Sequence, residues 1–330
     1  MLVVLKAKLK DILNTLAEEY KVLVPAKIED TSKFISYKDN VDIILDENVK
    51  LSPKDVFFPQ TEKMYKMKTV KTSMELENIT DEAGKKLLFG VRSCDMKSLD
   101  CFDQVFLTKG YVDEFYKNKR DSVVTIALSC SQPMQTCFCS AMGVDSQKAV
   151  GADVQAYDLG DKIGLEAISD EGSKVIELIK GQLTEEGAEV PQPGEFYLKV
   201  DADGVSEKLN GMFESPIWDD VSKKCLNCGA CTYVCPTCHC FDISQEVRGE
   251  NVTKYRCWDS CMFGEYTQMA GGHNPRPTKK ERVRNRFMHK LNYFPDRYNM
   301  LLCTGCGRCI NVCPVNLDIT SVIKQIKEAE

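Results

Sequence analysis

The sequence contains 17 cysteines in 330 residues, and eight of them form two runs with identical spacing. In each run three cysteines occur at every third position, and a fourth follows four residues later with a proline directly after it. A cubane [4Fe–4S] cluster needs four thiolates around one small object, and this spacing supplies three from one loop. The runs are Cys225, Cys228, Cys231 and Cys235 with Pro236, and Cys303, Cys306, Cys309 and Cys313 with Pro314.

The spacing predicts two [4Fe–4S] clusters that exchange one ligand each, because the fourth cysteine of such a run binds the other cluster. Gly229, Gly305 and Gly307 lie inside the loops, where small residues let backbone N–H groups approach the cluster sulfurs. Zinc is the alternative, but two complete runs of four fit zinc poorly. We assign Cys225, Cys228, Cys231 and Cys313 to the first cluster, and Cys303, Cys306, Cys309 and Cys235 to the second.

Four cysteines of the first half predict a third site. Cys94 and Cys130 each follow a short apolar segment, KLLFGV and SVVTIAL, typical of a buried parallel strand. If these strands are neighbours, both thiols emerge at one carboxyl edge, where open α/β sheets place their sites. Cys137 and Cys139 flank Phe138, so both can face one point. The four thiols could hold a third [4Fe–4S] cluster, or they are buried as small hydrophobic side chains.

The remaining cysteines have less clear roles. Cys101 lies on a predicted helix, where core packing is the better interpretation. Four others lie in the segments TCHCF and RCWDSCM, and the second pair has the spacing of one helix face. They could bind a fourth cluster or a zinc ion, or they pack around the two predicted clusters. These four are Cys238, Cys240, Cys257 and Cys261.

Composition excludes several classes of function. The net charge of −6 argues against nucleic-acid binding, which requires a strongly basic face. No segment approaches the roughly 18 apolar residues of a membrane span, and the N-terminal apolar run is too short for a signal peptide. We therefore expect a cytoplasmic protein, in which cysteines are metal ligands or redox thiols rather than disulfides. No P-loop, GxGxxG motif or nucleophile–base pair is present.

The elements that position these cysteines divide the chain in two. We predict an N-terminal α/β domain over residues 1–200 and a mainly α-helical dicluster ferredoxin-like domain over residues 201–330, with a helical insertion at 236–302. The overall class is α+β or mixed. The predicted strands cover residues 21–24, 34–37, 86–91 and 122–128. The predicted helices cover residues 6–19, 98–106, 111–116 and 319–329, and two more begin at residues 242 and 277. A linker is predicted over residues 187–194.

The segment 273–290 is rich in lysine and arginine. It is either a docking face for an acidic partner or an anionic cofactor, or a solvated helix face that partly offsets the charge of the clusters. We favour the solvated face.

The sequence contains five further motifs, which are GVRSCD (90–95), TCFC (136–139), PTCHCFD (236–242), WDSCM (258–262) and GGHNPRPT (271–278). Together these motifs resemble the iron–sulfur β subunit of soluble [NiFe] sulfhydrogenases, and they equally resemble the iron–sulfur electron-transfer subunit of anaerobic sulfite reductase. The resemblance covers most of the chain. It implies an electron relay between a flavoprotein, which carries FAD and a [2Fe–2S] cluster, and a catalytic subunit, and it supports the third site.

The expected function is therefore electron transfer through [4Fe–4S] clusters, with no catalytic site in this chain. The catalytic partner would be a hydrogenase, a sulfite reductase or another anaerobic reductase. Two alternatives remain: a self-contained sulfite or sulfur reductase with its active centre in the N-terminal domain, and a metal-stabilised binding module without a redox role.

Overall fold

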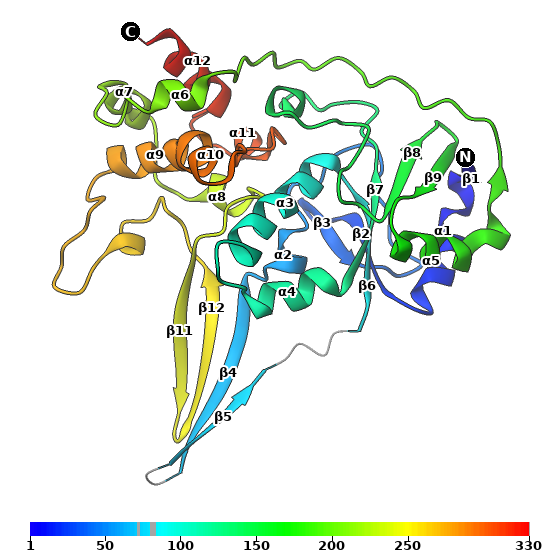
Figure 1. Ribbon diagram of the computed structural model, residues 1–330, viewed down its shortest axis with the longest axis horizontal. Coiled ribbons are helices and arrows are strands. Elements are labelled where there is room, and N and C mark those ends of the chain that lie inside the picture. Colours follow the sequence, from blue (N-terminus) through cyan, green and yellow to red (C-terminus); the bar gives the residue numbers. More distant parts are fainter. Residues whose placement is uncertain (71–72, 80–83, 330) are drawn as a thin grey trace.

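An eight-stranded sheet forms the centre of the first half of the molecule (Figure 1). The computed structural model describes residues 1–70, 73–79 and 84–329. The strand order is β10-β1-β9-β8-β7-β6-β2-β3, in which β2, β6, β7 and β8 run parallel and the remaining pairs are antiparallel. The strands are β1 (Leu2–Leu5), β2 (Lys21–Ile28), β3 (Thr31–Ser36), β6 (Lys86–Val91), β7 (Val123–Leu128), β8 (Val154–Asp158), β9 (Lys162–Ala167) and β10 (Thr184–Glu185).

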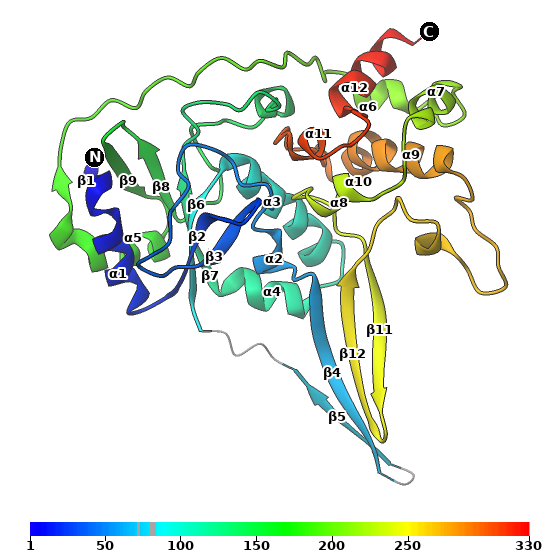
Figure 2. The ribbon, with the colours of Figure 1, turned by 180° about the vertical axis from the view of Figure 1, so that it is seen from behind.

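Helices cover both faces of this sheet (Figures 1 and 2). α1 (Leu9–Ala17) and α5 (Asp170–Ile179) share one apolar core with the strands. α2 (Lys54–Phe57), α3 (Ser93–Leu107) and α4 (Glu114–Asp121) share the core on the opposite face. The alternating burial of strand residues toward the two helical layers explains why the strand sequences are almost continuously apolar.

The two apolar segments next to Cys94 and Cys130 are the neighbouring parallel strands β6 and β7, as predicted. Their register shifts at Gly90, which has a φ of +82°, and a Cβ atom there would lie 3.1 Å from Cγ of Pro25. Only glycine meets both conditions without strain. Beyond this irregularity β6 leads directly into α3, so Cys94 lies in the first helical turn, and Cys130 lies just after β7. Both are at the carboxyl edge.

A second sheet, of order β11-β12-β4-β5, projects from the molecule as a narrow arm (Figure 1). The helix predicted to begin at residue 242 is wrong, because that segment is the strand β11. β12 pairs with β4, so the arm combines strands from both halves of the sequence. The strands are β4 (Thr61–Val70), β5 (Ser73–Asn78), β11 (Phe241–Arg248) and β12 (Asn251–Trp258).

Buried charges anchor this arm at its base. Arg256 of β12 donates to Oε2 of Glu62 on β4 over 2.6 Å and to Oδ2 of Asp113 before α4 over 2.5 Å. Lys119 of α4 also contacts Glu62. Arg256, Glu62 and Lys119 are buried, so each charge requires these partners to offset the loss of solvation.

The second half supplies seven helices among the described residues, and most of them share a core with Phe138 and Met142 of the first half. The helices predicted from residue 277 and over 319–329 are confirmed as α9 and α12. A π-helical turn, His289–Tyr293, continues α9 into α10. The helices are α6 (Val205–Leu209), α7 (Ile217–Lys223), α8 (Ala230–Tyr233), α9 (Lys279–Met288), α10 (Phe294–Tyr298), α11 (Arg308–Asn311) and α12 (Ile319–Glu328).

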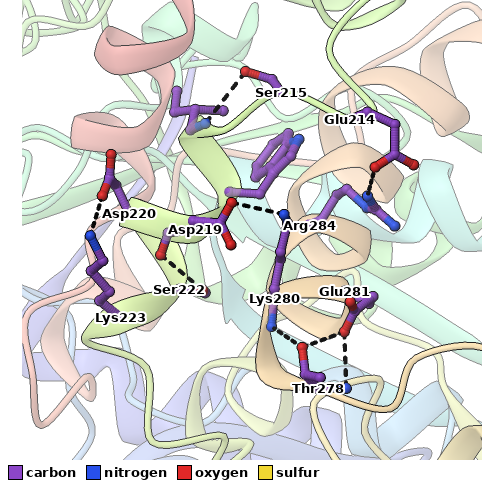
Figure 3. A network of polar contacts seen from close by, with 12 residues as sticks. Glu214, Ser215, Asp219, Asp220, Ser222, Lys223, Thr278, Lys280, Glu281 and Arg284 are labelled. Atoms are coloured by element: carbon purple, nitrogen blue, oxygen red, sulfur yellow. Dashed lines mark hydrogen bonds and ion pairs between the residues drawn. The ribbon is translucent and has the colours of Figure 1, made fainter.

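Polar contacts hold α9 against α7, the helix that leads into the first cysteine run (Figure 3). Nζ of Lys280 lies 2.8 Å from Oδ2 of Asp219, and Nζ of Lys279 donates to the carbonyl of Lys223 over 2.9 Å. Thr278 and Glu281 form a capping box that fixes the start of α9. α9 is therefore fixed beside the first cysteine loop.

The chain is mixed α/β overall, as predicted. The mainly α-helical character predicted for the second half is not confirmed, since β11 and β12 occupy part of it. Residues 187–194 form no helix or strand and belong to a long connection between β10 and α6 (Figure 1). The division at residue 200 stays a prediction. None of the described helices is long and apolar enough to cross a membrane.

Candidate metal centres

The two cysteine runs have the same backbone conformation. Asn227 and Gly305 occupy equivalent positions with φ values of +54° and +64°. Gly229 and Gly307 follow at equivalent positions, each with a φ of +73°, and each directly precedes a short helix, α8 or α11. The repeated spacing thus produces a repeated loop, in which a left-handed residue turns the backbone N–H groups inward.

The first centre is a pocket lined by residues of both cysteine runs. The pocket brings together the four cysteines assigned to the first cluster, including Cys313 from the other run. Backbone N–H groups already point at two of its sulfurs: that of Asn227 lies 3.3 Å from Sγ of Cys225, and that of Leu317 lies 3.2 Å from Sγ of Cys313. Cys228 is exposed, so this centre reaches the molecular surface. The lining cysteines are Cys225, Cys228, Cys231 and Cys313.

The second centre joins Cys235 to the other run. Burial raises the pKa of Cys303 to about 11, and the nearby thiol of Cys235 adds to the rise. Cys235 likewise contributes to the raised pKa values of Cys306 and Cys309, where burial is again the main cause. The structure therefore places these four thiols close together, in the combination assigned to the second cluster.

A third centre lies at the carboxyl edge of β6 and β7. Cys94, Cys130, Cys137 and Cys139 line one pocket, and Cys306 of the second run also lines it. Cys94, Cys137 and Cys139 are buried, whereas Cys130 is half-buried. The four thiols thus share one cavity, as the parallel-strand argument expected.

Two polar residues order the loops of this third centre. Nη1 of Arg92 donates to the carbonyl of Ser129 over 2.7 Å, which links the end of β6 to the residue before Cys130. Nδ2 of Asn48 lies 3.5 Å from Sγ of Cys94 and donates to it. Arg92 belongs to the GVRSCD motif, but its role as a link between strand ends depends on contacts that sequence alone does not show.

The second cysteine loop packs directly on the third centre. The N–H of Phe138 donates to the carbonyl of Gly305 over 2.8 Å. A Cβ atom on Gly305 would lie 2.5 Å from Cα of Cys139, so no larger residue fits there. Sγ of Cys137 lies 3.9 Å from the carbonyl oxygen of Cys306. The loop of the second centre therefore lies directly against the third centre.

The burial of the thiols in the N-terminal centre is typical of cysteines that bind a metal. Burial raises the pKa of Cys137 to about 11 and that of Cys139 to about 12, because a thiolate is poorly solvated there. Positive charge from bound iron would compensate for that loss and ionise the thiols. Together with the glycine-lined loops, this donor set fits [4Fe–4S] clusters.

The basic segment 273–290 differs from the predicted solvated face. Arg284, Arg286 and Lys290 are buried, and Arg286 and Lys290 face cysteines. The helical spacing of Val283, Arg286, Phe287 and Lys290 places them on one face, and this pattern is the signal that the sequence interpretation missed.

The cysteines without an assigned role do not come together as a set of four. Hydrogen-bonding contacts join Cys238 to Cys235, and Cys240 to Cys261. Cys257 lies apart, on β12 opposite Asp242 and Thr61. Within residues 1–70, 73–79 and 84–329, no three His, Cys, Asp or Glu side chains are placed to hold a single metal ion. Cys101 is buried beside Phe294 and Leu302, consistent with core packing.

Comparisons with known proteins agree with the cysteine pattern. Residues 224–317 match the family model of a 4Fe-4S dicluster domain. The chain is 31% identical to sulfhydrogenase 2 subunit beta of Pyrococcus furiosus over 326 residues, which cover 96% of this chain and 95% of that protein. No solved structure matches. With its dicluster domain and its full-length similarity, the chain belongs to the family of sulfhydrogenase β subunits, the iron–sulfur subunits that transfer electrons in an oxidoreductase complex.

Proposed function

We propose that this subunit carries electrons along three [4Fe–4S] clusters in the order N-terminal centre, second centre, first centre, or the reverse. The observation that carries this proposal is the position of the second cysteine loop. Cys306 lines the N-terminal pocket while its neighbours in the run face Cys235, and Cys313 of the same run lines the first pocket. One loop thus touches all three thiol centres.

This arrangement supports three proposed ligand sets. When bound, [4Fe–4S] clusters supply one-electron oxidation and reduction. The chain's own residues supply thiolates, donate N–H groups to sulfur and bury most of each site away from water. The sets are Cys225, Cys228, Cys231 and Cys313; Cys303, Cys306, Cys309 and Cys235; and Cys94, Cys130, Cys137 and Cys139.

The two terminal centres of this proposed order would serve different partners. At one end, the exposed Cys228 brings the first centre to the surface. At the other, the half-buried Cys130 lines the N-terminal pocket. We propose that one end binds a flavoprotein subunit with FAD and a [2Fe–2S] cluster, and that the other end binds a catalytic oxidoreductase subunit. The full-length similarity to a sulfhydrogenase β subunit supports a complex of this kind.

Iron analysis with EPR on the anaerobically purified chain tests the proposal. Three clusters predict about 12 iron atoms per chain, and each should be reduced by dithionite. A content of about 8 iron atoms per chain would show that the N-terminal centre holds no cluster. Bound zinc without iron would overturn the whole proposal.

Turnover by the isolated chain separates electron transfer from catalysis. The reconstituted subunit is expected to accept electrons from a reduced viologen dye but not to oxidise the dye continuously with sulfite or sulfur. Sustained turnover without other subunits would instead identify a self-contained reductase.

A further inference from the structure

Two buried cations lie among the thiols of the ferredoxin-type half. Arg286, on α9, is 5% exposed, and Lys290, in the π-helical turn that follows, is 3% exposed. Neither forms an ion pair with a carboxylate in the part of the chain that the structure describes. A buried charge without a partner of opposite sign is strongly unfavourable, because the charge loses its hydration. The negative partner of these cations must therefore be something other than Asp or Glu.

Arg286 faces both cysteine loops. The side chain interacts electrostatically with Cys231 of the first centre and with Cys309 of the second, and it lines the first pocket. Its Nε atom is buried without a hydrogen-bond partner among the described residues. An arginine stays charged in proteins and carries five N–H donors, so this guanidinium presents an unused donor and a full positive charge between the two centres.

Lys290 faces the second centre alone. Its Nζ atom lies 3.2 Å from Sγ of Cys235, 2.9 Å from Oγ1 of Thr237 and 3.4 Å from the carbonyl oxygen of Leu302. Three acceptors match the three donors of an ammonium group. The other thiols that interact with it are Cys238 and Cys303. The π-helical turn, a feature frequent at functional sites, brings this lysine inward.

We infer that Arg286 and Lys290 set the reduction potentials of the two ferredoxin-type clusters, Arg286 acting on both and Lys290 on the second. Reduction adds one negative charge to a cluster, so a nearby fixed positive charge stabilises the reduced form and raises the potential. The inference rests on the proposed ligand sets. The inference goes beyond the ligand sets because it gives a role to two residues that bind no iron. By setting the cluster potentials, Arg286 and Lys290 would influence the direction of electron transfer.

An EPR-monitored redox titration of the full chain with its clusters tests this assignment. Arg286→Gln should lower the potential of two of the titration steps, whereas Lys290→Met should lower one. Arg284→Gln is the matched control, because Arg284 is a buried arginine of the same helix whose Nη1 atom bonds the carbonyl of Phe213 and pairs with Glu214 instead of facing a cysteine (Figure 3). This control should leave every step at its wild-type potential.

Charge-preserving variants separate electrostatics from structure. Arg286→Lys and Lys290→Arg should retain potentials close to those of the wild type, and they carry the test if the neutral variants bind too little iron. Unchanged potentials in iron-complete Arg286→Gln and Lys290→Met chains would overturn the inference. So would equal shifts in Arg284→Gln, or a lowered potential in the charge-preserving variants. A wild-type chain without [4Fe–4S] signals would refute the proposed ligand sets instead.

Discussion

Arg308 at the start of α11 forms a buried, bidentate ion pair with Asp95 on α3. Nη1 lies 2.6 Å from Oδ1, and Nη2 lies 3.0 Å from Oδ2. The same guanidinium donates from Nε to the carbonyl of Val49 over 2.7 Å. Asp95 directly follows Cys94, and Arg308 directly precedes Cys309. The pair therefore fastens the second cysteine loop to the N-terminal centre at the point where the two halves of the chain meet.

Arg308→Met should destabilise the protein strongly, because it leaves the carboxylate of Asp95 buried without its partner. Breaking a buried ion pair costs about 3–5 kcal/mol. Chemical denaturation of the anaerobic protein, followed by tryptophan fluorescence, should show this loss as a lower midpoint. The control is Lys324→Met, which breaks an exposed pair with Glu328 and should cost less than about 1 kcal/mol. Equal midpoints for the two variants would contradict the structural role of Arg308.

Cys137→Ser should remove one cluster and leave the other two. The iron content is expected to fall from about 12 to about 8 atoms per chain, with one EPR signal lost. Cys101→Ser provides the control, since Cys101 is buried beside Phe294 rather than in a thiol pocket, and it should keep the full iron content. A wild-type iron content in Cys137→Ser would show that the N-terminal thiols only pack.

The parts of the sites that local patterns determine could be predicted. The spacing of the two runs is sufficient to predict that Cys313 lies with Cys225, Cys228 and Cys231, and the apolar strands KLLFGV and SVVTIAL place Cys94 and Cys130 at one edge. The first inference needs only the ligand exchange that is known for this spacing, and the second needs only the rule that neighbouring parallel strands end at the same edge.

The parts that depend on distant pairing were missed. The segment from 241 has Phe241, Ile243 and Val247 at even spacings, which fit one face of a strand, but the i,i+4 spacing of Ile243 and Val247 also fits a helix. The sheet is completed by β4, far away in the sequence. Arg286 and Lys290 were interpreted as solvated because charged residues are rarely buried. Their burial makes sense only beside thiol centres, which the helix sequence does not reveal.

Stability should decrease as the pH falls below neutrality because two histidines are buried in the neutral form. Burial lowers the pKa of His239 to about 4 and that of His289 to about 3, and His239, Lys290 and Arg276 contribute further to the shift at His289. The pKa of histidine in an unfolded chain is about 6.5. Below that pH the unfolded chain binds protons that the folded chain does not, so the free energy of unfolding falls.

His289→Phe should make this pH dependence weaker. Denaturation midpoints of the anaerobic protein at pH 7.5 and 5.5 give the comparison, and the variant should lose less stability over this interval than the wild type. The difference is at most about 1.4 kcal/mol for each pH unit below the unfolded pKa. An identical loss in both proteins would show that His289 takes up no fewer protons when folded.

Gly305→Ala should disturb the contact between the second and the N-terminal centre. Gly305 has a φ of +64°, and a Cβ atom there would lie 2.5 Å from Cα of Cys139 and 2.6 Å from its backbone nitrogen, so the loop that carries Cys139 must shift. Gly249→Ala is the control: it has a similar φ of +60° but open space around the added atom, and it should cost only the conformational strain of about 1–2 kcal/mol. Iron content and EPR spectra of the two variants test whether this contact supports the two centres. In Gly305→Ala we expect less iron and altered signals from the N-terminal and second clusters, with the first cluster retained, whereas equal iron and identical spectra in both variants would show that the two centres do not share this contact.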